Sequence, residues 1–85
     1  MKIIDVRTKG EYEGGHIQGA ELLDIMDMMQ GVYPAVPFDA EILLYCESGN
    51  RAMMAKTMLE KAGYTNVTNG GSVEDVLSLG YELVK

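Results

Sequence analysis

The feature that most constrains the fold is an apolar run that ends on the chain's only cysteine and gives way, after a short loop, to helical spacing. Residues 42–45 form the most apolar run of strand length, and Cys46 follows them. Small and apolar residues then recur at helical spacing over residues 51–62. A buried strand followed directly by a helix is typical of sheets that are covered on both faces. We therefore expect an α/β domain in which residues 42–45 form the central strand.

The rest of the chain alternates in the same way between short strands and short helices. Thr8 and Glu11 have the T-x-x-E spacing of a capping box, and Ser72 with Asp75 marks another capped helix start. Strands are predicted at residues 3–6, 20–23, 42–45 and 64–68, and helices at residues 9–13, 24–31, 51–62 and 72–80. This order predicts a mainly parallel central sheet of about four to five short strands with helices on both faces.

Two segments join these elements without a helix or strand of their own. Residues 32–39 contain both prolines and form a long connection, which we expect beside the mouth of the functional site. The Asn-Gly-Gly sequence at residues 69–71 predicts a turn. The chain of 85 residues, 47% of them hydrophobic, shows no repeat or linker, so residues 1–85 are expected to form a single domain.

The charge of the chain limits the partners that it can bind. The formal net charge is −6 without a basic cluster, so the long-range field repels nucleic acids and anionic membranes. No apolar run approaches the length of a membrane span, and Asp5 follows Met1 too closely for a secretory signal. We expect a cytoplasmic monomer that binds neither nucleic acid nor membrane.

Cysteine and histidine usage limits the chemistry as well. A single cysteine excludes an internal disulfide and fits a reducing cytoplasm. The 7 methionines have one cysteine and one histidine as companions, which is too few for a copper site of useful spacing. The methionines are therefore interpreted as core filler, and no metal site is predicted.

Cys46 is the candidate nucleophile. At the junction of strand and helix it lies at the positive end of a helix dipole, among backbone N–H groups that have no partner inside the helix, and these surroundings favour the thiolate. Gly49 allows backbone conformations in which successive N–H groups face one anion, and Arg51 adds a permanent positive charge. The alternative is that Cys46 is a small buried hydrophobic residue. The spacing of Gly49 and Arg51 favours the nucleophile.

The C-E-S-G-N-R sequence of residues 46–51 resembles the C-x-x-G-x-R active-site loop of rhodanese-type sulfurtransferases. Two further segments resemble signatures of the same family and flank the loop in the family's order. They are D-V-R at residues 5–7 with E-Y at residues 11–12 and G-H-I-Q-G-A at residues 15–20, and then G-Y-T-N-V at residues 63–67 with the glycine pair at residues 70–71. The resemblance covers nearly the whole chain and implies a single rhodanese-like domain.

The resemblance implies a reaction in which Cys46 takes the outer sulfur from thiosulfate or a persulfide, holds it as a persulfide, and passes it to a thiol, a protein acceptor or cyanide. No further cofactor is implied. The active-site loop that binds the substrate and the persulfide consists of Glu47, Ser48, Gly49, Asn50 and Arg51.

Three residues outside the loop are assigned supporting or structural roles. Asp5 and Arg7 are interpreted as scaffold residues that support the loop, because buried charges are kept paired. Asp5 is also the predicted partner of Arg51, because it lies at the end of the neighbouring strand. His16 is interpreted as a structural residue that hydrogen-bonds its turn.

Two other functions remain open at this point. Cysteine phosphatases resemble C-x5-R, a longer loop that fits a phosphate dianion, whereas four residues separate Cys46 from Arg51 here, so phosphatase or arsenate reductase chemistry is the weaker alternative. A rhodanese-like domain can also serve as a non-catalytic protein-binding or redox-sensing module. Glu47 places an acid in the loop and is expected to disfavour thiosulfate relative to a persulfide donor.

Overall fold

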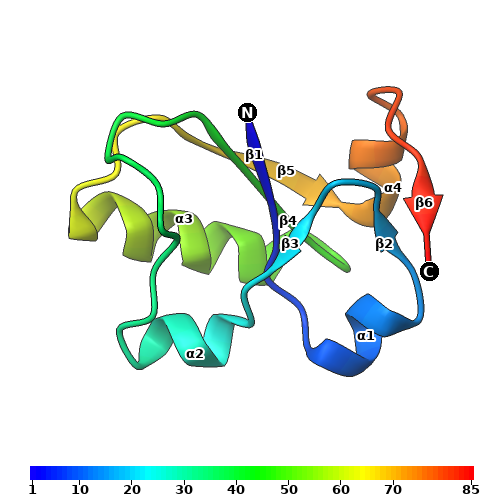
Figure 1. Ribbon diagram of the computed structural model, residues 1–85, viewed down its shortest axis with the longest axis horizontal. Helices are drawn as coiled ribbons and strands as arrows, with labels where there is room; N and C mark the ends of the chain where they lie inside the picture. Colours follow the sequence, from blue (N-terminus) through cyan, green and yellow to red (C-terminus); the bar gives the residue numbers. More distant parts are fainter.

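The computed structural model describes residues 1–85 and contains a four-stranded parallel sheet (Figure 1). The sheet order is β3-β1-β4-β5, so β1 and β4 are the interior strands. The strands are β1 (Lys2–Asp5), β3 (Glu21–Leu22), β4 (Ile42–Cys46) and β5 (Val67–Ser72). Every residue of β4 is buried. The predicted α/β class, the parallel sheet and the interior position of the most apolar strand are confirmed.

Four helices connect the strands, and local capping chemistry fixes where they begin. They are α1 (Lys9–Glu13), α2 (Ile25–Met29), α3 (Asn50–Ala62) and α4 (Val73–Leu77). The side chains of Thr8 and Ser72 each accept a hydrogen bond from the N3 backbone of the following helix, and each capping box is complete. Gly63 ends α3 at a φ of 111°, a left-handed conformation that favours glycine. None of these helices is long and apolar enough to cross a membrane.

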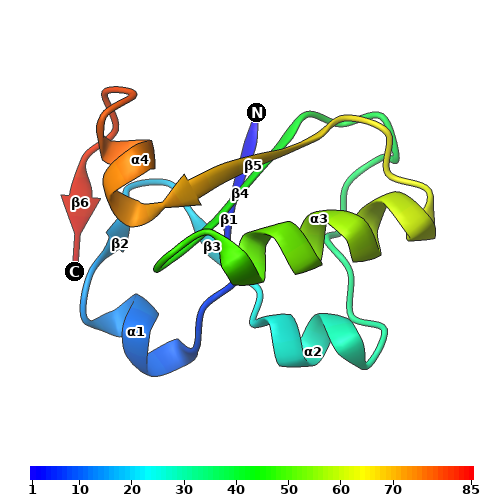
Figure 2. The same ribbon diagram turned by 180° about the vertical axis from the view of Figure 1, so that it is seen from behind.

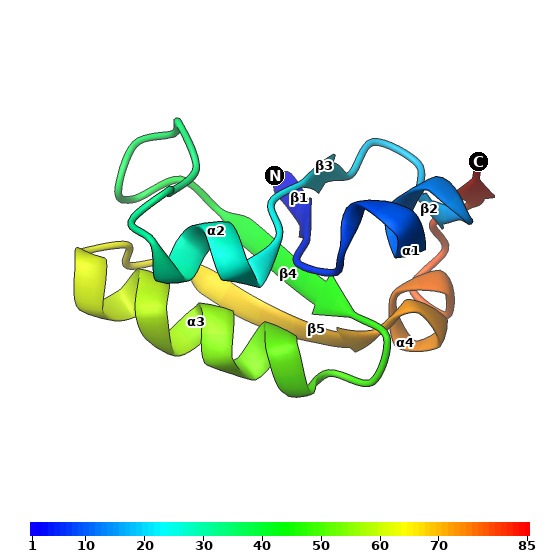
Figure 3. The same ribbon diagram turned by 90° about the horizontal axis from the view of Figure 1, so that it is seen from below.

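The two faces of the sheet carry different cores. Side chains from α2 and α3 pack on one face together with Ile4, Ile42 and Leu44 of the sheet. Ile3, Leu43 and Tyr45 point to the other face, where α4 and β2 cover them. This alternation follows from the two-residue period of a strand. Figures 2 and 3 show α2 beside α3, with α4 at a distance from both.

A small second sheet was not predicted. β2 (His16–Ile17) pairs antiparallel with β6 (Leu83–Val84), which brings the C-terminal segment beside the segment that follows α1 (Figure 1). Each strand has 2 residues, too few for a periodic pattern to reveal it. This sheet extends the covered face that contains Ile17 and Val76.

The prediction of a turn at residues 69–71 is wrong, because these residues continue β5. The pairing of β5 with β4 has an irregularity between Leu44 and Cys46, and Ser72 ends the strand opposite Cys46. A Cβ atom on Gly70 would lie 3.0 Å from both the Leu43 side chain and the Leu44 carbonyl oxygen. Glycine is therefore required here by close packing of β5 on β4 rather than by chain reversal.

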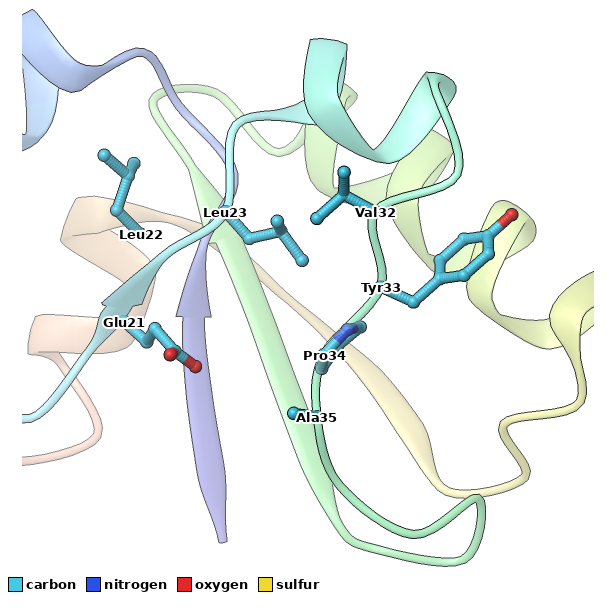
Figure 4. A pocket seen from close by; sticks show the side chains of 7 residues that line it. All are labelled: Glu21, Leu22, Leu23, Val32, Tyr33, Pro34 and Ala35. Atoms are coloured by element: carbon cyan, nitrogen blue, oxygen red, sulfur yellow. The ribbon is translucent and has the colours of Figure 1, made fainter.

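The long connection at residues 32–39 lies away from the cysteine loop, contrary to the prediction. Phe38 packs edge-on against Tyr64 at a centroid distance of 4.9 Å, and the Tyr64 hydroxyl donates to the Pro34 carbonyl at 2.7 Å. These contacts hold the connection at the C-terminal end of α3. A pocket between β3 and residues 32–35 is shown in Figure 4, and no residue of the 46–51 loop lines it.

Candidate active site

Cys46 is the last residue of β4 and has no exposed surface. The backbone N–H of Gly49 donates a hydrogen bond to its Sγ atom at 2.9 Å. The N–H groups of Glu47 and Ser48 make no hydrogen bond inside the protein, and both residues are exposed. The loop thus offers the sulfur one N–H donor and leaves two others available for a ligand or solvent, at the carboxyl edge of the sheet, where open α/β sheets bind ligands.

The loop reaches this position because Gly49 adopts a φ of 92°. This left-handed residue is the N-cap of α3 and brings the backbone close to β5, where an added Cβ would lie 3.4 Å from the Cα of Gly71. Asn69 connects the two segments, because its Nδ2 donates to the Gly49 carbonyl at 3.4 Å while its Oδ1 accepts from the Gly71 N–H at 2.8 Å. The predicted turn had concealed this role of Asn69.

The predicted pairing of Arg51 with Asp5 is wrong, because Arg51 pairs with Glu11 of α1. Its Nη1 and Nη2 atoms donate to the two carboxylate oxygens of Glu11 at 2.7 and 2.9 Å. These hydrogen bonds lower the pKa of Glu11 to about 2. The pKa of Arg51 is raised, chiefly by the hydrogen bond to Glu11, and the charge of Cys46 acts in the same direction. Arg51 therefore lies within electrostatic reach of the sulfur.

Asp5 is unavailable to Arg51 because Arg7 and Tyr45 already bind it. The Arg7 guanidinium donates to Asp5 at 2.8 to 3.0 Å, and the Tyr45 hydroxyl donates to the same carboxylate at 2.8 Å. Asp5 and Tyr45 are fully buried, and the Arg7 side chain is 5% exposed. Burial opposes the charge of Arg7, but the hydrogen bonds and the charge of Asp5 outweigh it and raise its pKa. Burial and Asp5 likewise raise the pKa of Tyr45.

Arg7 connects this buried group to the cysteine loop. Its Nη2 donates to the Gly15 carbonyl at 2.6 Å, and its Nη1 donates to the carboxylate of Glu47 at 3.0 Å. The Glu47 side chain is 62% exposed, so the contact lies at the rim of the site. These contacts join the end of β1 to the loop after β4, and the supporting role of Asp5 and Arg7 stays a prediction.

Glu11, Tyr45 and Asn69 are neighbours of the site that the sequence analysis did not assign to it. Glu11 had been explained by the capping box of α1, where its Oε1 accepts from the Thr8 N–H at 3.1 Å. The sequence did contain a signal for Tyr45, because a hydroxyl-bearing side chain in a buried strand, next to the cysteine, needs a hydrogen-bond partner.

His16 lies outside the loop, as expected. Its Nδ1 atom is 2.9 Å from the Tyr12 carbonyl oxygen, and its ring stacks on that of Tyr12 at 3.7 Å between centroids. The histidine therefore bonds to the preceding turn. No group of three or more His, Cys, Asp and Glu residues is arranged to hold a metal ion.

Comparison with known proteins agrees with this geometry. The rhodanese-like domain family matches residues 1–74. "Thiosulfate sulfurtransferase PspE" of Escherichia coli is 34% identical over 74 residues, which are 86% of this chain and 71% of PspE. Two further curated relatives are longer, and the matched regions span 53% and 60% of them.

Solved structures show the same fold. A rhodanese-like domain of the Alr3790 protein from Anabaena superposes with a TM-score of 0.84 at 25% identity, covering 100% of this chain and 99% of that one. A structure described as "rhodanese with anions from E. coli" gives a TM-score of 0.83 at 27% identity, covering 99% of this chain and 96% of that one. With the cysteine loop, the parallel sheet and the match over residues 1–74, the chain belongs to the rhodanese-like domain family.

Proposed function

We propose that this chain is a rhodanese-type sulfurtransferase that carries a sulfane sulfur on Cys46. The observation that carries the proposal is the buried Sγ of Cys46, which accepts a hydrogen bond from the Gly49 N–H beneath the start of α3. Relatives that bear the name thiosulfate sulfurtransferase support the same reaction class. The wider proposal is a cytoplasmic monomer with a small sulfur donor, a thiol or protein acceptor, and no bound cofactor.

The first half-reaction loads the enzyme. The Cys46 thiolate attacks the outer sulfur of the donor, a new S–S bond forms to that sulfur, and the donor's own S–S bond breaks. The donor leaves with the electron pair of that bond, as sulfite from thiosulfate or as a thiolate from a persulfide. An acceptor thiolate or cyanide then attacks the outer sulfur and regenerates the Cys46 thiolate.

The loop provides the charge compensation for this cycle. The backbone N–H groups of residues 47–51 stabilise the thiolate and the persulfide, since preorganised N–H dipoles act strongly on a partly buried anion. Arg51 adds a positive charge close to the sulfur and is itself held by Glu11. Asp5 and Arg7 position the loop from beneath. Because Cys46 has no exposed surface, exchange with a donor requires a local opening around the sulfur.

Intact-mass spectrometry tests the proposal. Wild-type protein incubated with thiosulfate or a small alkyl persulfide is expected to gain the mass of one sulfur and to lose it when cyanide is added. The Cys46→Ser variant, matched in shape and unable to form a persulfide, is expected to show neither change while keeping its circular dichroism spectrum. Absence of an adduct with every donor would contradict sulfur transfer and favour a non-catalytic binding or redox-sensing module.

A further inference from the structure

Both guanidinium groups near Cys46 are already paired with carboxylates. Arg51 makes two hydrogen bonds to Glu11, at 2.7 and 2.9 Å, and its side chain is 31% exposed. Arg7 bonds Asp5 on its buried side and Glu47 on its outer side. The positive charge of each guanidinium is thus already opposed by at least one carboxylate. An anionic head group of a donor would have to compete with these carboxylates for the charge of either arginine.

The balance of charge around the sulfur is negative even before the thiolate is counted. Two guanidinium groups face three carboxylates, those of Asp5, Glu11 and Glu47. Lys9 is the one cation of α1, but it is exposed and takes no part in an ion pair, so solvent screens its charge. The groups around the sulfur therefore carry a formal excess of one negative charge, which disfavours an incoming anion.

On the basis of the proposed sulfur transfer, we propose that Glu11 and Glu47 select donors by charge: persulfides with a neutral or cationic head group load Cys46, and sulfonate-headed donors such as thiosulfate are disfavoured. Glu11 is paired with Arg51 and Glu47 with Arg7, and both carboxylates have exposed surface. The backbone N–H groups of the loop suit the single outer sulfur that every sulfane donor shares. The site can therefore distinguish donors only by the head group that carries the outer sulfur.

The chemistry of the step makes the head group decisive. From an alkyl persulfide, the outer sulfur passes to Cys46 and a thiolate carrying one negative charge leaves. From thiosulfate, the same S–S bond breaks and the departing sulfite carries two negative charges. A doubly charged leaving group needs more compensating positive charge than a singly charged one. Here it has to compete with Glu11 for Arg51 or with Glu47 for Arg7.

The two carboxylates differ in how firmly they are held. Glu11 accepts from Arg51 with both oxygens and from the Thr8 backbone. Glu47 makes one contact, from Arg7, and is 62% exposed. Replacing Glu11 leaves Arg51 without a carboxylate partner, whereas Arg7 keeps Asp5 when Glu47 is replaced. Glu11→Gln should therefore relax the selection more than Glu47→Gln.

Stopped-flow loading of Cys46 measures the selection directly. The probes are thiosulfate, 2-hydroxyethyl persulfide with a neutral head and cysteamine persulfide with a cationic head, each at low ionic strength. The quantity compared is the ratio of the second-order loading rate with thiosulfate to that with the neutral persulfide. Glu11→Gln and Glu47→Gln are compared with Glu13→Gln, which removes the same charge from an exposed residue of α1 that forms no ion pair.

We expect the ratio to be below one in wild-type protein and to rise about tenfold in Glu11→Gln, with a smaller rise in Glu47→Gln. Glu13→Gln is expected to change it less than about twofold because exposed charges are screened. In wild-type protein the cationic persulfide should load at least as fast as the neutral one.

The outcomes separate this inference from the proposed function. If Cys46 loads with all three donors but thiosulfate equals or exceeds the neutral persulfide, selection by charge is overturned and sulfur transfer stands. The same conclusion follows if the ratio moves equally in all three variants. If no donor loads Cys46, both proposals fall. Should Glu11→Gln not fold, Glu47→Gln and the salt dependence of the wild-type ratio, which is expected to rise with ionic strength, decide the matter.

Discussion

Two ion pairs flank Cys46, and they show how burial changes the meaning of one chemical interaction. The Arg7–Asp5 pair is buried, with side chains 5% and 0% exposed, whereas the Arg51–Glu11 pair is 31% and 32% exposed. The shortest nitrogen–oxygen distances are nearly equal, at 2.8 Å for Arg7–Asp5 and 2.7 Å for Arg51–Glu11. In the buried pair, removing one partner leaves a charge with no access to water. In the outer pair, solvent can replace the lost partner, so the pair adds little to stability. Its main effect is on the local charge and on the position of the loop.

The largest expected effect comes from breaking the buried pair with Asp5→Asn. The amide removes the negative charge opposite Arg7, and we expect a loss of about 3 to 5 kcal/mol in the free energy of unfolding. A domain of ordinary stability has only about 5 to 15 kcal/mol, so the variant should be marginal. Urea denaturation measures this change, and turnover with a fixed donor should fall because the buried group that joins the end of β1 to the cysteine loop is disrupted.

Glu47→Gln is the matched control, since it removes the other carboxylate of Arg7 from an exposed position. Its free energy of unfolding should change by less than about 1 kcal/mol. Equal stability of the two variants would contradict the assignment of different roles to buried and exposed partners. Unchanged stability and turnover in Asp5→Asn would overturn the supporting role of Asp5 altogether.

A smaller loss of stability is expected when only the hydroxyl of Tyr45 is removed. Tyr45→Phe deletes the donor to Asp5 and the acceptor for the Ile17 N–H, at 2.8 and 3.0 Å, while the ring still packs against β2 and α4. The unpaired Ile17 N–H should cost about 1 to 3 kcal/mol. Chemical denaturation with the same urea protocol measures it, and loading of Cys46 should persist. A loss as large as that of Asp5→Asn would show that the hydroxyl, rather than the charge pair, holds the site together.

The same contrast explains which parts of the protein the sequence could predict. Helix starts depend on residues three apart, so the complete capping boxes at Thr8 and Ser72 were predictable from spacing alone. The position of Cys46 at the end of an interior strand followed from local hydrophobicity and the helix that comes next. Local chemistry was therefore enough to place Cys46.

Partners that are far apart in the sequence were not predictable. Glu11 and Arg51 are 40 positions apart, and no local sequence pattern indicates that their side chains pair. Asp5 was the reasonable choice for Arg51 on strand adjacency, but its oxygens were already taken by the nearby Arg7 and by Tyr45. The Asn-Gly-Gly segment illustrates a second limit. Gly70 is required because β5 packs closely on β4, and Gly71 lies close to Gly49 of the cysteine loop. Turn statistics include neither of these long-range contacts.

The smallest expected effect concerns the outer pair and its dependence on pH. Arg51 lowers the pKa of Glu11 from 4.5 to about 2, so the folded state binds this proton less readily than the unfolded state. The resulting stabilisation is fully present above pH 4.5 and is lost as the pH falls toward 2. Solvent screening limits it to less than about 1 kcal/mol.

Glu11→Gln removes this dependence. The difference in the free energy of unfolding between wild-type protein and Glu11→Gln should be largest near neutral pH and should shrink between pH 4.5 and 2. Glu13→Gln, on the same helix and without an ion pair, supplies the background slope. Carboxyl NMR titration provides the direct reading, because the pKa of Glu11 should lie well below 4.5, its value without Arg51. A Glu11 resonance that titrates near 4.5 would mean that the pair with Arg51 does not persist in solution. Arg51 would then be free to bind an anionic donor, and the distinction between an inner pair that supports the site and an outer pair that selects its substrate would be lost.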